Sequence, residues 1–149
     1  MPLVKEDCKV LEGHSSKSPK FTLKCHKTYA KCVHVYDGDT VHVVFKMPGI
    51  GADTCYKWVI RLNGIDTPEI KSKNANEKSK AVESRDFLKG KILDKIIIVE
   101  CSDFDKYGRL LGEIYLEENG KTLSQMMIEG GYAKPYDGGT KKGWAELDE

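Results

Sequence analysis

The segment KCVHVYDGDTVHVVF (residues 31–45) contains two runs of β-branched and aromatic residues on either side of Asp37-Gly38-Asp39. Such runs, partly alternating with polar residues, are typical of β-strands. We expect a tight turn between them, in which Gly38 suits backbone angles that other residues rarely adopt. The segment therefore predicts two strands joined by a turn that carries two carboxylates.

Three further segments have the same strand-like composition. They are YKWVIRL (residues 56–62), DKIIIVE (residues 94–100) and RLLGEIYLE (residues 109–117). The intervening MPGIGAD (residues 47–53) predicts a hairpin loop, and Tyr107-Gly108 predicts a turn. The chain thus carries five predicted strands.

Two segments show the periodicity of amphipathic helices. In the first, Ala81, Leu88 and Ile92 share one face with Phe87 beside it, and Asn74 or Asn76 is the expected N-cap. In the second, residues 123–128 follow a capping-box pattern made by Thr122 and Gln125, and Gly130-Gly131 ends the helix.

The order of three strands, a helix, two strands and a helix predicts an α+β fold, a small five-stranded β-barrel of the OB type with packed helices. A chain of 149 residues suffices for one hydrophobic core and hardly for two. We expect that domain over residues 28–149. Residues 1–27 are polar and Lys-rich without periodicity, and they predict an N-terminal extension of uncertain order.

Composition excludes some classes of protein. The formal net charge of +1 does not indicate a strongly basic nucleic-acid binder, although an enzyme needs positive charge only at its site. No apolar run has the length that spans a bilayer, and residues 1–20 lack the apolar core of a secretory signal. We therefore expect an intracellular monomer without membrane contact, with secretion by another route left open.

The five cysteines predict reduced thiols rather than a disulfide framework. Several of them fall near histidines, which raises the alternative of a zinc site made from Cys8, His14, Cys25, His26 and Cys32. Because this spacing contains no short Cys-x₂-Cys pair, the structural interpretation is favoured over the metal site.

Carboxylates follow two of the predicted strands. Asp39 lies in the first turn, and Asp66, Thr67 and Glu69 come just after the strand at residues 56–62. If those strands pair, the carboxylates converge at one end of the barrel, where their mutual repulsion favours a bound divalent cation. Ligands that are all oxygen favour Ca²⁺, Mg²⁺ or Mn²⁺ over zinc.

Two arginines complete a possible phosphate site. Arg61 precedes Asp66 by five residues, and Arg109 follows the turn at Tyr107-Gly108. Guanidinium groups match pairs of phosphate oxygens, and with a metal they would stabilise the charge on a five-coordinate phosphorus. Glu69 would orient or deprotonate the attacking water. Taken one at a time, these segments also suit ordinary turns, and Asp105 with Arg109 also suits a hairpin salt bridge.

The joint order of these segments resembles the staphylococcal nuclease (thermonuclease) family. The resemblance runs from about Cys32 to Lys134 and includes VYDGDTV (residues 35–41), RLNGIDTPE (residues 61–69), DKYGRLLGEIY (residues 105–115) and LSQMMIEGGYA (residues 123–133). It implies a five-stranded OB barrel with helices packed around it. It also implies Ca²⁺-dependent hydrolysis of DNA and RNA, with water attacking phosphorus and leaving 3′-phosphate ends.

The resemblance assigns roles to individual positions. It implies that Asp39 and Asp66 bind Ca²⁺ through their side chains and Thr67 through its backbone carbonyl. Arg61 and Arg109 match phosphate-binding arginines, and Glu69 matches the carboxylate proposed as general base. Three further positions are implied in substrate binding, namely Lys106, Tyr107 and Tyr136.

The chain departs from the family pattern at three places. The hairpin at residues 46–58 is longer, the loop IKSKNANEK (residues 70–78) is shorter, and PYDGGTKKGW (residues 135–144) stands where the family has a tyrosine-bearing loop and a third helix. We therefore expect that third helix to be absent.

The main alternative is a non-catalytic module that binds nucleic acid or protein. Relatives that lose activity replace the metal carboxylates or the phosphate arginines, and both sets are intact here. An unrelated single-strand-binding OB fold would carry basic and aromatic stripes on its strand face, whereas charge here is nearly balanced and aromatic residues make up 9%.

Overall fold

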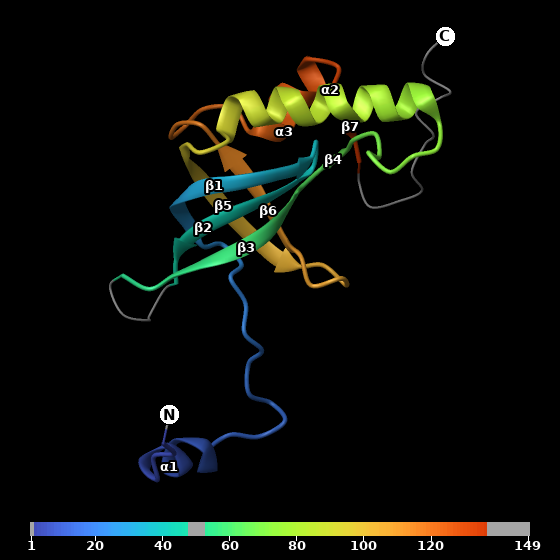
Figure 1. Ribbon diagram of the computed structural model, residues 1–149. Helices are drawn as coiled ribbons and strands as arrows, with labels where there is room; N and C mark the ends of the chain where they lie inside the picture. Colours follow the sequence, from blue (N-terminus) through green and yellow to red (C-terminus); the bar gives the residue numbers. More distant parts are fainter. Residues whose placement is uncertain (1, 48–52, 137–149) are drawn as a thin grey trace.

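Five strands form a closed barrel in the computed structural model, which describes residues 2–47 and 53–136 (Figure 1). The strands are β1 (Lys27–Asp37), β2 (Thr40–Lys46), β3 (Cys55–Leu62), β5 (Ile96–Phe104) and β6 (Leu110–Tyr115). Their order around the barrel is β1-β2-β3-β6-β5, and all pairs are antiparallel except β3 with β6. The predicted α+β fold and the five-stranded barrel are confirmed.

Alternating side chains fill the barrel. In β2 the residues Val41, Val43 and Phe45 are buried, while His42 between them is partly exposed on the outer face. Phe45 also stacks on Trp58 with ring centroids 5.5 Å apart. The strand pattern of the sequence thus places one set of residues in the core and the other set on the surface.

Two helices pack on the barrel, as the sequence predicts. Helix α2 (Ala75–Ile92) begins after Asn74, whose side chain accepts the backbone N–H of Glu77 at 3.0 Å. Helix α3 (Leu123–Glu129) begins after Thr122, whose hydroxyl accepts the N–H of Gln125. Both helices lie across the end of the barrel where β1 finishes (Figure 1).

A second, two-stranded sheet was not predicted. It pairs β4 (Ile65–Asp66) with β7 (Lys134–Pro135), so that Asp66 lies opposite Lys134. Strands of two residues leave no periodicity to recognise in a sequence. This sheet fixes the segment that follows β3, which carries several of the candidate site residues.

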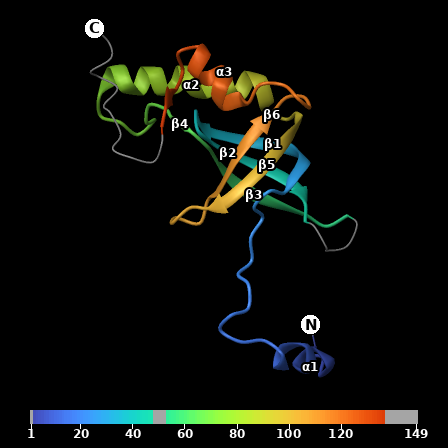
Figure 2. The same ribbon diagram turned by 180° about the vertical axis from the view of Figure 1, so that it is seen from behind.

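The N-terminal segment combines an exposed part with an anchored part. Helix α1 (Glu6–Glu12), which the sequence did not indicate, has no buried residue and lies away from the barrel in Figures 1 and 2. Leu23, in contrast, is buried in the core, and the backbone N–H of Cys25 donates to the carbonyl of Cys101. The chain therefore joins the barrel several residues before β1.

The structure bears only in part on three further expectations, which concern the cysteines, a membrane span and a third helix. All five cysteines are free thiols, and the described residues contain no group of three or more His, Cys, Asp or Glu side chains able to hold a metal ion. No helix of the described part has the length and apolarity needed to cross a membrane. The expected absence of a third family helix falls on residues 137–149, which lie outside the described residues, as does most of the predicted loop at 47–53.

Candidate active site

One cavity collects residues from all three sequence segments. Its volume is about 340 Å³, and it lies where the turn between β1 and β2, the segment after β3 and the turn before β6 meet. Every predicted metal and catalytic residue lines it, namely Arg61, Glu69, Arg109, Asp39, Asp66 and Thr67. The geometric expectation that carboxylates and arginines from distant segments meet at one place holds.

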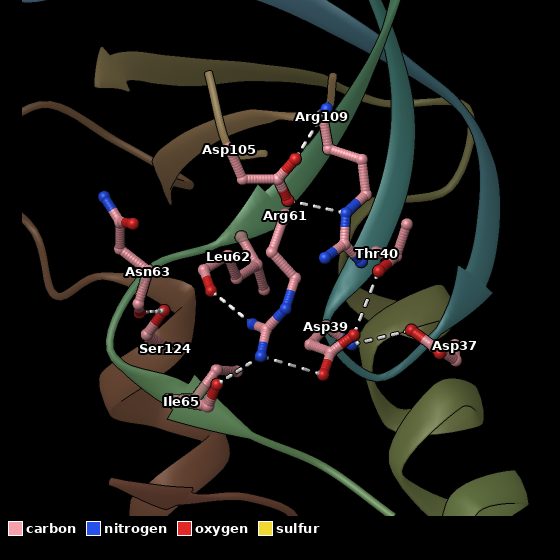
Figure 3. Close-up of polar contacts among 10 residues, drawn as sticks. All are labelled: Asp37, Asp39, Thr40, Arg61, Leu62, Asn63, Ile65, Asp105, Arg109 and Ser124. Carbon is pink, nitrogen blue, oxygen red and sulfur yellow. Dashed lines mark hydrogen bonds and ion pairs between the residues drawn. The ribbon is translucent and has the colours of Figure 1, made fainter. Parts of the chain in front are cut away.

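The turn between β1 and β2 holds its carboxylates through short hydrogen bonds. The backbone N–H of Asp39 donates to Oδ1 of Asp37 at 3.1 Å, and the hydroxyl of Thr40 donates to Oδ1 of Asp39 at 2.9 Å (Figure 3). The backbone N–H of Leu62 donates to the carbonyl of Asp39, which ties the turn to β3. The Asp39 carboxylate is therefore fixed before any ligand arrives.

Gly38 is required for packing, and the prediction that it supplies unusual backbone angles is wrong. Its φ angle is not among the positive values, which belong to Gly64, Gly108 and Gly131 among the described glycines. A Cβ atom at Gly38 would lie 2.8 Å from Cβ of Ser84 and 3.0 Å from Cγ2 of Thr67. The turn therefore approaches both α2 and the segment after β4 closely.

Arg61 is held by the backbone on one side and by a carboxylate on the other. Its Nη1 donates to the carbonyl of Leu62 at 2.6 Å, and its Nη2 donates to the carbonyl of Ile65 at 2.8 Å. Nη2 also lies 3.4 Å from Oδ2 of Asp39 (Figure 3). Because Arg61 is only 7% exposed, these contacts fix its guanidinium at the wall of the cavity.

Arg109 reaches the same cavity from the other side. Its Nε donates to Oδ2 of Asp105 at 2.8 Å, while its backbone N–H donates to Oδ1 of the same carboxylate. The salt bridge expected from a simple hairpin is therefore present, and it coexists with a place at the cavity. Figure 3 shows the guanidinium groups of Arg61 and Arg109 around the carboxylate of Asp39.

The segment after β3 supplies the remaining oxygen atoms. Asp66 is 6% exposed and Thr67 is 2% exposed, so both side chains are buried at the cavity. The Thr67 hydroxyl is buried and has no hydrogen-bond partner within the described part of the chain. Glu69 is exposed at the rim, and its backbone N–H donates to the side chain of Glu77 on α2.

Negative charge is in excess within the cavity. Four carboxylates line it against three cationic side chains, the latter being Arg61, Arg109 and Lys71. Burial raises the pKa of Asp37 to about 7, and the neighbouring Asp39 carboxylate adds to the rise while Arg61 opposes it. Close, buried carboxylates of this kind favour a cation beside them.

A second cavity adjoins the first and contains the predicted substrate-binding residues. Its volume is about 520 Å³, and Arg61 and Arg109 line both cavities. The second cavity is also lined by Lys106, Tyr107 and Tyr136. Tyr107 is 73% exposed, and the backbone N–H of Tyr136 donates to the carbonyl of Gly64. Two arginines therefore stand between an acidic cavity and a basic, aromatic one.

Sequence reasoning missed several residues of the first cavity. Asp37, Tyr36 and Lys71 line it, although only Asp39 was singled out from the first turn. The Asp-Gly-Asp pattern contained the signal for Asp37, because two carboxylates separated by one residue flank the same turn. Lys71 begins the Lys-rich stretch of residues 71–91, whose composition indicates mainly a solvated helix face and, in part, electrostatic guidance of substrate, but no place in the cavity.

Comparison with known proteins agrees with this geometry. A family model described as staphylococcal nuclease homologue matches residues 59–146, more than half of the chain. A protein of Escherichia coli named "Uncharacterized endonuclease" is 30% identical over 113 residues, which cover 76% of this chain and 64% of that protein. "Staphylococcal-like nuclease CAN1" of Arabidopsis thaliana is 39% identical over 80 residues, covering 54% of this chain and 22% of that protein.

A third relative, "Endonuclease YhcR" of Bacillus subtilis, is 32% identical over 110 residues, which cover 68% of this chain and 8% of that protein. This chain thus spans less than two thirds of the length of each of these three relatives. The family match, the barrel and the clustered segments agree, and the chain belongs to the staphylococcal nuclease family.

Proposed function

We propose that this protein is a Ca²⁺-dependent nuclease that hydrolyses phosphodiester bonds in DNA and RNA. The observation that carries the proposal is the single cavity that Asp39, Asp66, Arg61 and Arg109 line together. Membership of the staphylococcal nuclease family supports it, as do relatives named as endonucleases and nucleases.

The oxygen atoms at the cavity fit a hard divalent cation. Asp39 and Asp66 would hold Ca²⁺ through their carboxylates, and Thr67 through its backbone carbonyl. The buried hydroxyl of Thr67, which has no partner in the described residues, supports an additional polar group at this place. Two carboxylates with a carbonyl and water suit the flexible, oxygen-only coordination of Ca²⁺. When bound, the ion would offset negative charge on the phosphate oxygens.

The two arginines bind the phosphate and stabilise its extra charge in the transition state. Arg61 is fixed by two backbone carbonyls and Arg109 by Asp105, so neither needs to reorganise during the reaction. Preorganised donors of this kind contribute most where charge develops in the transition state. Because both arginines line both cavities, we infer that the scissile phosphate binds at the junction.

Glu69 accepts the proton of the attacking water. Its carboxylate is exposed at the rim of the cavity, where water has access. The oxygen of that water attacks phosphorus and the bond to the 5′ oxygen breaks; the 5′ oxygen takes up a proton from solvent, which leaves a 3′-phosphate end and a 5′-hydroxyl end. Lys106, Tyr107 and Tyr136 hold the neighbouring nucleotide in the second cavity through charge and stacking.

Digestion of a plasmid and of an RNA tests the proposal against a non-catalytic binding module. Purified protein is incubated with Ca²⁺, with Mg²⁺ or with a chelator, and the end groups of the products are identified. We expect both polymers to be cleaved in Ca²⁺, with 3′-phosphate ends, and neither to be cleaved in chelator. Mg²⁺ should support little cleavage, because it holds its waters. Binding without cleavage would establish the alternative, and equal rates in Ca²⁺ and Mg²⁺ would contradict the metal site.

A further inference from the structure

A group of basic side chains lies on the outer face of the barrel beside the first cavity. His34 on β1 and His42 on β2 are cross-strand partners, and their ring centroids are 5.0 Å apart. Lys57 on β3 lies on the same face, because it pairs with Val44, two residues beyond His42. We call these three residues the basic cluster. Figure 1 shows the three strands side by side.

The basic cluster continues in line with the candidate active site. His42 is two residues from Thr40, which pairs with Arg61, and His34 is two residues from Tyr36, which lines the first cavity. Two residues along a strand advance the backbone by about 7 Å. His34 and His42 therefore lie about one nucleotide step of an extended strand from Tyr36 and Thr40. Lys57 lies one further step away, opposite Val44.

Positive charge in the basic cluster is not balanced by the protein. Within residues 2–47 and 53–136, no hydrogen bond or ion pair joins any of its three members to a carboxylate. His34 and Lys57 are exposed and His42 is partly exposed. Burial, together with His34 and Lys57, lowers the pKa of His42. Lys57 supplies a fixed positive charge, and the two imidazole rings beside it offer N–H donors with no acidic partner among the described residues, a combination that suits an anionic ligand.

We propose that the basic cluster of His34, His42 and Lys57 is a binding subsite for a second phosphodiester of the substrate strand, one or two nucleotides from the bond that is cut. This inference rests on the proposed nuclease function and extends it to an extended single strand laid along β1–β3. The imidazole rings offer faces on which a base stacks, and Lys57 offers a point charge to the phosphate. The first cavity binds the scissile phosphate, and the basic cluster holds the strand in register.

Binding of labelled oligothymidylates without turnover tests the subsite. Fluorescence anisotropy in chelator compares oligomers of about three and about eight nucleotides, lengths chosen below and within the usual site size of an OB fold. Lys57→Ala and His42→Gln should each weaken binding of the longer oligomer about 3- to 10-fold and leave the shorter one unchanged. Lys57→Ala should also lower the salt dependence by about 0.7 in logarithmic slope, the value for one lost phosphate contact.

Lys121→Ala is the control, because Lys121 is an exposed lysine between β6 and α3, outside strands β1–β3, where it pairs with Glu129. A pH comparison adds a readout that a structural role would not give. Wild-type protein should bind the longer oligomer more tightly at about pH 5.5 than at about pH 7.5. His42→Gln should reduce this difference, and the part that remains comes from the Asp37 carboxyl in the adjoining cavity, which gains a proton over the same range.

Three outcomes would overturn the subsite. They are an unchanged affinity in both variants, an equal loss for short and long oligomers, and a wild-type protein that binds neither oligomer. Failure of the nuclease proposal is distinct from all three, because it shows as an absence of cleavage in Ca²⁺ while length-dependent binding to the basic cluster persists.

Discussion

A single carboxylate, that of Asp105, both closes the turn before β6 and orients Arg109. Oδ2 accepts Nε of Arg109 at 2.8 Å, while Oδ1 accepts the backbone N–H groups of Arg109 and Tyr107. Although burial alone would raise it, these hydrogen bonds hold the pKa of Asp105 below its ordinary value. Asp105 is therefore ionised at neutral pH. It orients the guanidinium of Arg109, which lines the first cavity together with Asp39.

This relationship predicts a graded loss of activity in two variants. Arg109→Ala should lower kcat about 10²- to 10³-fold, because a preorganised donor to the transition state is lost. Asp105→Asn should lower it about 10-fold, since its single amide oxygen can keep the hydrogen bonds of only one carboxylate oxygen and the negative charge is lost. Single-turnover cleavage of an oligonucleotide measures both effects. Arg85→Ala, at a partly exposed arginine on α2, is the control, and full activity of Arg109→Ala would contradict the role of Arg109.

Strand periodicity made most of the barrel predictable. The run of β-branched and aromatic residues around Val41, Val43 and Phe45 predicted β2. Thr122 predicted the start of α3, and of the two caps that the sequence left open for α2, Asn74 or Asn76, the structure has Asn74. These are local signals, because backbone geometry relates residues a few positions apart. They indicate where elements begin and which face is buried, and the structure agrees.

Contacts between distant segments were less accessible. No local pattern links Gly38 to Ser84, since their closeness depends on how α2 lies over the end of the barrel. The pairing of Ile65 with Pro135 likewise depends on the path of the chain after α3. The convergence of Asp39 and Asp66 was predictable only by assuming that their strands pair. Asp37 was missed because turn chemistry alone accounted for it.

The close approach at Gly38 predicts a large effect of one methyl group. Gly38→Ala should destabilise the fold by about 1–3 kcal/mol, because the added Cβ would meet the side chains of Ser84 and Thr67 at 2.8–3.0 Å. Gly90→Ala is the matched control in α2, where a Cβ meets nothing within 4 Å. We expect that control to gain about 0.5–1 kcal/mol from its helical position. Urea denaturation measures both, and equal stability of the two variants would exclude the packing role.

Ca²⁺ should stabilise the protein against heat through Asp39 and Asp66. A ligand that binds only the native state at about a hundredfold its Kd adds about 2.7 kcal/mol to the free energy of unfolding. The Tm of wild-type protein should therefore rise with Ca²⁺, whereas that of Asp66→Asn should barely change. Asp86→Asn, at an exposed carboxylate on α2, should respond as wild type does. An identical rise in Asp66→Asn would place the ion elsewhere.

Glu113 on β6 predicts a dependence of stability on pH. Burial raises the pKa of Glu113 from 4.5 to about 7; a hydrogen bond with Ser124 opposes this, and Glu100, its partner across the strands, adds to it. The native state therefore retains a proton that the unfolded chain releases. The stability that this proton gives is complete below about pH 4.5 and is lost as pH rises to about 7.

Glu113→Gln keeps the neutral form at every pH and should remove that loss. Relative to wild type, the free energy of unfolding of this variant should rise between about pH 4.5 and 7. Above that range it should stay about 1–3 kcal/mol higher than that of wild type. This value is smaller than the full pKa difference would give, because the carboxyl is partly exposed. Denaturant unfolding at several pH values measures the difference, which cancels every other titrating group common to both proteins. Glu118→Gln makes the same chemical change at an exposed site and should follow wild type at each pH. A gap that does not change with pH, or that widens toward acid, would mean that Glu113 is ionised in the native state at neutral pH.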